Sequence, residues 1–123
     1  MANYLFVSLG AALGGSLRYW LSSFVYKFLP ATFPYGTLII NGVGSFILGF
    51  IMFDLNERGL IGHELRLFLT VGFCGGFTTF STFSFETVNL LKDGQYMSAA
   101  LNVFLSLFLC LGGVFLAYII SKI

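Results

Sequence analysis

The chain has 123 residues, of which 58% are hydrophobic and only 9% are charged. A water-soluble domain carries about 25% charged residues, so this composition excludes an ordinary soluble protein and indicates one that is integral to a membrane. The net charge of +1 and the lack of a basic cluster exclude nucleic acid as a partner.

Four segments are expected to cross the bilayer as helices, because a spanning helix needs about 20 mostly apolar residues. They are separated by two prolines, by a strongly charged stretch and by a Lys-Asp-Gly turn. No further domain remains outside them, so we predict a single all-α transmembrane domain. The expected spans cover residues 4–29, 35–53, 67–91 and 96–121.

The basic residues of the short loops set the orientation of a membrane protein, and here they are almost evenly divided. Charge alone therefore leaves open one fixed orientation or dual topology, in which oppositely inserted copies pair. A four-helix bundle fills its own centre with side chains, so a conduction path needs an interface and a homodimer is expected. The basic residues on the side of the termini are Arg58, Arg66 and Lys122, and those opposite are Lys27, Lys92 and, if it snorkels, Arg18.

The first segment carries Arg18, the only cation in the middle of a span. A charge at membrane depth is costly and is by default a functional candidate. It could attract an anion into a vestibule, pair with an acid of another chain or snorkel to a helix end, and the residues leave these alternatives open. The same segment holds the motif Gly10-Ala11-Ala12-Leu13-Gly14, and a second GxxxG spans Gly72 to Gly76. Both predict close helix packing.

Polar residues also follow single faces of the second and fourth segments. Asn41 lies near the middle of an otherwise apolar span, with Ser45 one turn later on the same face. A buried amide is costly unless several partners are met, which favours a functional role for Asn41. Asn102, Ser106 and Cys110 are spaced four apart, and such a stripe could donate hydrogen bonds to a passing anion. For Ser106 alone, helix–helix hydrogen bonding is the favoured interpretation.

The third segment contains the most informative string, GFCGGFTTFSTFSFE, from Gly72 to Glu86. Two adjacent glycines followed by two β-branched threonines argue against a continuous helix. A break at membrane depth is tolerated only where the backbone is buried in protein or lines a cavity. Carbonyls freed at such a break can bind a cation, and the N-terminus of the following half-helix favours an anion.

After the expected break, Phe80 and Phe83 face one way and Ser81 and Ser84 form a neighbouring polar stripe. A phenylalanine ring has a positive edge, which can line an anion path without presenting a full charge that would trap the ion. A lipid-facing stripe is the alternative. The interleaved hydroxyls favour the pore-lining role, because a lipid-facing helix does not need them.

The remaining reactive side chains indicate no further chemistry. Cys74 and Cys110 have no CxxC motif or histidine cluster beside them and are expected to pack as small hydrophobic residues. For Glu86, an interfacial acid paired locally is the favoured interpretation. No nucleophile–base pair or metal set is present, so an enzyme is not expected.

The third-segment string, with PYGTLIINGVGSF at 34–46 and GGSLRY at 14–19, closely resembles the Fluc (CrcB) fluoride channels over all four spans. The resemblance implies an antiparallel, dual-topology homodimer in the bacterial inner membrane, with two pores that passively export fluoride and protect the cell from its toxicity. It also implies a structural sodium ion at the dimer centre, held by the backbone carbonyls of Gly75 and Thr78. The residues expected along the fluoride path are Asn41, Phe80, Phe83, Ser81, Thr82, Ser84, Ser106 and Arg18.

One departure from the family pattern and two rival functions remain. Cys110 stands where the family's hydroxyl track continues, and a thiol is the weaker donor. A small proton-coupled multidrug exporter would need a carboxylate in the first span, where the only charge is Arg18. A membrane interaction protein without transport would not need the combination of Asn41 with the Phe, Ser and Thr string.

Overall fold

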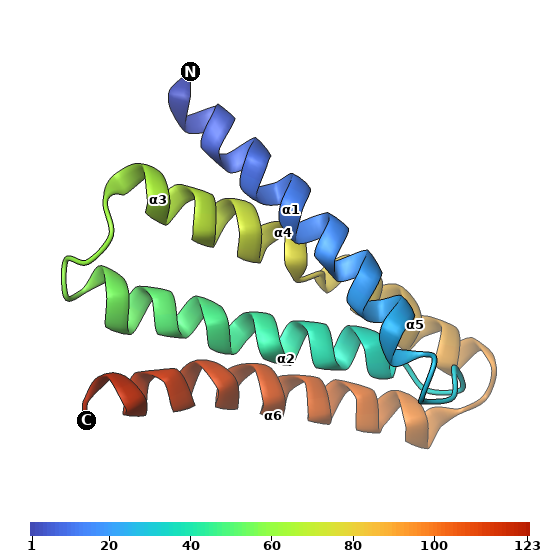
Figure 1. The fold of residues 1–123 in the computed structure, drawn as a ribbon. Coiled ribbons are helices and arrows are strands. Elements are labelled where there is room, and N and C mark those ends of the chain that lie inside the picture. The colour runs from blue at the N-terminus through green and yellow to red at the C-terminus, as the bar shows by residue number, and fades with distance from the viewer.

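The computed structural model describes residues 1–123, and every regular element in it is helical (Figure 1). The short elements η1 and η2 are wound as π-helices and continue neighbouring α-helices. The elements in chain order are α1 (Ala2–Val25), α2 (Tyr35–Phe50), η1 (Ile51–Asn56), α3 (His63–Leu67), η2 (Phe68–Cys74), α4 (Gly75–Phe77), α5 (Phe80–Lys92) and α6 (Tyr96–Ser121).

Three helical rods are long and apolar enough to cross a membrane. Counting α1 as the first, the second rod is Tyr35–Asn56, the third is His63–Lys92 and the fourth is Tyr96–Ser121. The helix α1 has 24 residues, enough for about 36 Å, but Arg18 and its serines and glycines make it less apolar than the other three. The charged stretch expected as a loop from residue 54 is partly helical, because charged side chains can continue a helix beyond its apolar part.

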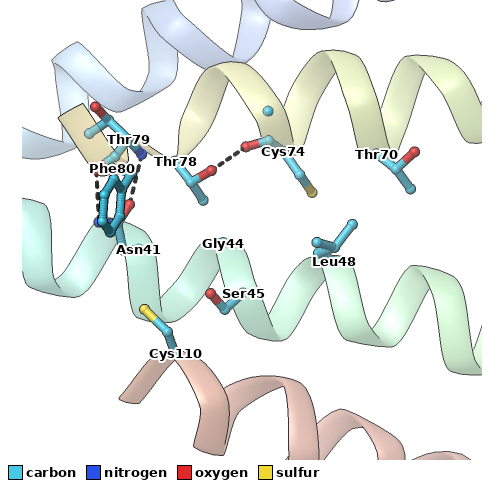
Figure 2. Close-up of a pocket in the computed structure, with 11 residues that line it drawn as sticks. Asn41, Gly44, Ser45, Leu48, Thr70, Cys74, Thr78, Thr79, Phe80 and Cys110 are labelled. Atoms are coloured by element: carbon cyan, nitrogen blue, oxygen red, sulfur yellow. Dashed lines mark hydrogen bonds between the residues drawn. The ribbon is translucent and has the colours of Figure 1, made fainter. Parts of the chain in front are cut away.

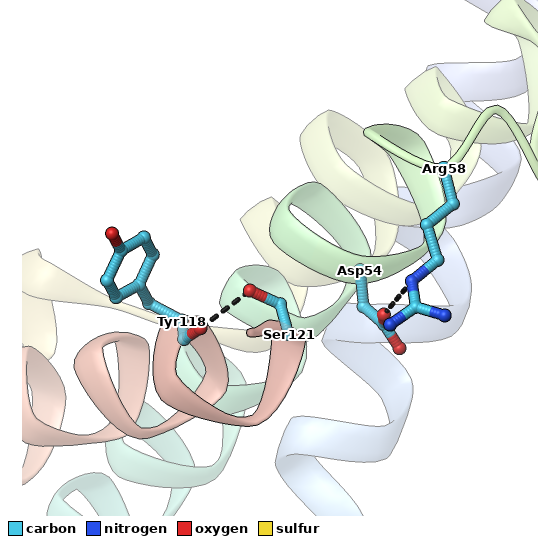
Figure 3. Close-up of polar contacts among 4 residues, drawn as sticks. All are labelled: Asp54, Arg58, Tyr118 and Ser121. Atoms are coloured by element: carbon cyan, nitrogen blue, oxygen red, sulfur yellow. Dashed lines mark hydrogen bonds and ion pairs between the residues drawn. The ribbon is translucent and has the colours of Figure 1, made fainter. Parts of the chain in front are cut away.

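The polar ends of the second rod and of α6 lie together, where Phe53 packs edge-on against Tyr118. Figure 3 shows two local contacts there. The Arg58 guanidinium lies 2.7 Å from the Asp54 carboxylate one turn before it, and the Ser121 hydroxyl donates to the Tyr118 carbonyl at 2.6 Å. A pair of this i,i+4 type contributes only about 0.3–0.5 kcal/mol, so it marks the polar end of the bundle rather than holding the fold.

Close packing of backbones joins α1 to the third rod, as the two GxxxG motifs predict. In Figure 1, α1 crosses the η2 and α4 region while α2 and α6 run side by side. A Cβ at Gly10 or Gly14 would collide with backbone atoms of Phe68 or Phe73. From the other side, a Cβ at Gly72 would come within 2.7 Å of the Val7 carbonyl. The interface therefore depends on the absence of side chains.

Replacing Gly14 by alanine is expected to destabilise the protein by about 1–3 kcal/mol, because the new methyl group meets rigid backbone. The matched control is Gly15→Ala, since a Cβ at Gly15 meets nothing within 4 Å. Thermal unfolding in detergent measures both variants. Equal melting temperatures for the two variants would contradict this account of the interface.

The third rod is interrupted at Thr78 and Thr79, whose ψ angles of 159° and 112° belong to extended backbone. Within the stretch of two glycines and two threonines that argued against a continuous helix, the break falls at the threonines, and Gly75 and Gly76 are helical. A Cβ at Gly76 would come within 2.6 Å of the Ala11 carbonyl, so this glycine serves the contact with α1. The chain leaves the helix only at the β-branched pair that follows.

Candidate functional site

The extended backbone at Thr79 is held by one side chain of α2. Asn41 accepts a hydrogen bond from the Thr79 amide at 2.8 Å through Oδ1 and donates to the Thr79 carbonyl at 3.0 Å through Nδ2 (Figure 2). The several partners that a buried amide needs are therefore backbone groups of the interruption. One amide hydrogen of Asn41 remains for another acceptor. Its predicted role in the ion path stays a prediction.

The interruption also explains the position of Arg18. Its Nε donates to the carbonyl of Gly76 at 2.9 Å, 58 residues further along the chain. The helical donor for that carbonyl would be the amide of Phe80, which belongs to the next helix. Arg18 is therefore drawn toward the interruption and not toward a helix end, and the one ion pair of the structure lies elsewhere, between Arg58 and Asp54.

Two further carbonyls lose their helical donors at the interruption. The amide of Thr79, the helical donor for the Gly75 carbonyl, binds Asn41 instead. The amide of Thr82, the helical donor for the Thr78 carbonyl, binds the Thr79 hydroxyl at 3.2 Å and so caps α5. Carbonyl oxygens left in this way are suitable ligands for a hard cation. These are the two carbonyls that the family resemblance implies as sodium ligands.

A cavity of about 270 Å³, here called the break cavity, lies against this region. Figure 2 shows its wall, with Phe80 beside Asn41 and Cys110 reaching it from α6. Gly75 has no side chain, so its backbone itself forms part of the wall. Both cysteines are free thiols and line this cavity. The lining residues are Asn41, Gly44, Ser45, Leu48, Thr70, Cys74, Gly75, Thr78, Thr79, Phe80 and Cys110.

A smaller cavity of about 140 Å³, here called the Arg18 cavity, meets the first at Thr79, which lines both. Every polar side chain in its wall is a hydrogen-bond donor, and none is a carboxylate. With Nε committed to Gly76, the guanidinium keeps four N–H donors. Such a wall suits an anion. The lining residues are Arg18, Tyr19, Ser22, Thr37, Ile40, Thr79 and Thr82.

Phe80 and Phe83, the two phenylalanines predicted to line the ion path, are neighbours at the start of α5. The ring centroids of Phe80 and Phe83 are 5.5 Å apart and the rings are tilted by 43°. Phe80 is 79% exposed in the single chain. A path lined by this ring is therefore open on one side unless another molecule covers it.

The hydroxyls beside these rings are already engaged with one another or with the backbone. The Thr79 hydroxyl donates to the Thr82 hydroxyl at 3.1 Å and lies 3.3 Å from that of Ser81. The Ser84 hydroxyl donates to the Phe80 carbonyl at 3.0 Å. The hydroxyls of Thr79 and Ser84 can donate to an ion only by giving up these hydrogen bonds. The loss of those bonds offsets part of the gain, so the ion is bound weakly.

The stripe expected along α6 is divided between the core and the break cavity. Asn102 is 2% exposed and Ser106 is 7% exposed, so the chain itself covers both. Cys110 alone reaches the break cavity. The Asn102 side chain donates to the Thr87 hydroxyl at 2.9 Å, a contact that residue spacing did not reveal.

The interpretation of Glu86 as a locally paired acid is wrong. Its Oε1 is buried and has no hydrogen-bond partner, and no cation pairs with the group. The side chain lines a polar cavity of about 350 Å³ together with Tyr26, Asn89 and Asp93. Lys92, the nearest lysine in sequence, is exposed to the outside and does not pair with it.

Comparison with known proteins gives a consistent result over the whole chain. The family described as "CrcB-like protein, Camphor Resistance (CrcB)" matches residues 5–118. A protein of Geobacter sulfurreducens, named fluoride-specific ion channel FluC, is 49% identical over 92% of this chain and 91% of its own length. Proteins of the same name from Pelobacter propionicus and Methylocella silvestris are 47% and 41% identical, over 99% and 97% of this chain and 95% and 92% of their own lengths. These relatives are named as ion channels and not as enzymes.

Proposed function

The chain belongs to the CrcB-like family, and from this premise we propose that it is a fluoride-selective channel that exports fluoride passively and protects the cell from its toxicity. The observation that carries the proposal is the interruption at Thr78 and Thr79, which Asn41 holds open beside an aromatic pair. The two cavities at the interruption supply hydrogen-bond donors without a carboxylate. No observation favours the multidrug exporter, because the only charge in α1 is Arg18.

Fluoride is small and strongly hydrated, so a selective path must replace its water and still release it. Arg18 attracts the anion into the Arg18 cavity, where the Thr82 hydroxyl also lies. The remaining amide hydrogen of Asn41 and the ring edges of Phe80 and Phe83 then stabilise the ion without a full opposing charge. The hydroxyls of Ser81 and Ser84 contribute further donors along the path, whereas Ser106, predicted on the path, is covered by the chain and lines neither cavity. An ion with one charge that crosses the membrane gains about 2.3 kcal/mol per 100 mV of membrane potential. In a cell whose interior is negative, this potential drives anions out.

The channel is proposed to be an antiparallel, dual-topology homodimer in the bacterial inner membrane. In this arrangement α1 also crosses the membrane, beside the other three rods. Its Arg18 is stabilised by the Gly76 carbonyl and not by lipid. The 79% exposed ring of Phe80 supports a second copy, because a lone chain leaves that side of the path to lipid. The nearly even division of basic residues supports opposite insertion of the two copies.

The proposed dimer is tied together by one structural sodium ion, held by the backbone carbonyls of Gly75 and Thr78. The residues fit this role, because both carbonyls have lost their helical donors and both residues line the break cavity. The carbonyl oxygens would satisfy a hard cation that two interrupted helices share. Conduction itself depends on the side chains named above.

Removal of sodium is expected to weaken the dimer. A ligand at 100 times its dissociation constant stabilises its complex by about 2.7 kcal/mol, so exchange of subunits should become roughly 100-fold faster without it. Subunit exchange between two fluorescently labelled pools, in sodium and in N-methyl-D-glucamine at equal ionic strength, measures the effect. The same exchange rate in both media would contradict the sodium site.

The channel function is tested with purified protein in liposomes loaded with potassium fluoride. With valinomycin present, the fluoride electrode should record fast efflux driven by the membrane potential, and liposomes loaded with chloride should release almost none. Exchange of a drug cation that follows a proton gradient, without fluoride efflux, would support the exporter and overturn the proposal.

A further inference from the structure

The helix α5, which carries the path aromatics, is attached to the rest of the chain by two asparagine side chains. At its start, Asn41 of α2 holds Thr79. In its third turn, Asn102 of α6 donates to the Thr87 hydroxyl at 2.9 Å, the one side-chain hydrogen bond between α5 and α6. Phe80 and Phe83 lie between these two attachment points.

The second attachment point continues to Phe83 itself. The Thr87 hydroxyl, which accepts from Asn102, donates in turn to the Phe83 carbonyl at 2.8 Å. The two hydrogen bonds therefore fix α5 against α6 and tie this contact to the backbone of Phe83.

Asn102 is placed to act on Phe83 and not on an ion. Its side chain is 2% exposed, and neither it nor Thr87 lines either of the cavities at the interruption. A buried amide of this kind is costly unless it is bonded, so the bond to Thr87 is maintained. Through Thr87, Asn102 is linked to the backbone of Phe83, four residues before Thr87 on α5.

We infer that Asn102 is a positioning residue for Phe83, acting through the Thr87 hydroxyl, and that the pair determines how fast the channel conducts. This inference rests on the proposed function. It assigns Asn102 a role different from that of a donor in a stripe facing the ion, because the ion never reaches it. It also gives a role to Thr87, which the sequence pattern did not single out.

The test is a double-mutant cycle in the liposome assay, with Asn102→Leu, Thr87→Val and the double variant. Each single substitution should lower the fluoride efflux rate about tenfold, the rate equivalent of one lost buried hydrogen bond. The double variant should lose about tenfold and not about hundredfold, since both substitutions break the same contact. Thr87→Ser keeps the hydroxyl and should restore the wild-type rate, and the fluoride concentration for half-maximal efflux should not change in any variant.

The proposed channel function and the role of Asn102 fail in different measurements. If wild-type liposomes release no fluoride, the channel function is refuted; if the wild type conducts, the variants decide the role of Asn102. The inference is overturned if Asn102→Leu slows efflux while Thr87→Val does not, or if the two losses multiply. It is also overturned if Thr87→Ser fails to rescue, or if neither substitution changes the rate. Should Asn102→Leu fail to give helical, monodisperse protein in detergent, Asn102→Ala replaces it in the same cycle.

Discussion

Fluoride efflux is expected to fall to the background of empty liposomes when Asn41 is replaced by leucine. The leucine leaves the amide and the carbonyl of Thr79 without partners, and each unsatisfied buried group costs about 1–3 kcal/mol. The backbone then finds other partners, and the capping hydroxyl of Thr79 moves with it. A path that depends on this geometry loses about 2–6 kcal/mol in total, enough to abolish conduction at the sensitivity of an electrode.

The matched control for Asn41 is Ser45→Ala, one turn later on the same face of α2. Ser45 lines the same cavity but has no hydrogen bond to the interruption, so efflux should fall much less. The liposome assay with a fluoride electrode measures both variants after their helicity has been checked by circular dichroism. Efflux of Asn41→Leu within a factor of two or so of the wild type would contradict the role given to the amide.

Replacing Phe80 by isoleucine is expected to lower the efflux rate about tenfold or more while the dimer persists. Isoleucine keeps the apolar bulk but has no positive ring edge, so the anion loses a stabilising contact of about 1.4 kcal/mol at the barrier. The single chain leaves this ring exposed, so the substitution does not disturb its core. Efflux from liposomes and size-exclusion chromatography of the same preparation test the two parts of the prediction.

Phe85→Ile is the matched control for the ring-edge argument. Phe85 lies on the same helix and is also largely exposed, at 71%, but it lines neither cavity at the interruption. Its efflux should equal that of the wild type. Equal losses in the Phe85 and Phe80 variants would show that bulk on α5 matters and not a ring edge beside the ion.

Composition and hydropathy were sufficient to predict an all-helical membrane protein, because lipid requires long apolar helices. The uncharged run from Tyr96 to Ser121 is helical over the predicted range. The second and third rods extend beyond their predicted ends, because Asp54 and His63 lie in helical turns outside the apolar parts. Charge indicates where a helix meets water and not where it ends.

The interruption was predicted from residue propensities within the stretch from Gly75 to Thr79, but which of these residues leave the helix was not. Gly75 and Gly76 stay helical because α1 packs against that stretch, and only a tertiary contact with Ala11 shows why Gly76 is small. The partners of Asn41 and Arg18 are backbone groups 38 and 58 positions away, which no local pattern reveals. Asn102 was assigned to a polar stripe for the same reason, since spacing defines a face of a helix but not what covers it.

A density map of the protein in a lipid nanodisc tests the central claim most directly. The account predicts extended backbone at Thr78 and Thr79, with Asn41 bonded across it and the rings of Phe80 and Phe83 against a second copy or ordered water. An unbroken helix through residues 75–83, with both rings surrounded by acyl chains, would contradict it.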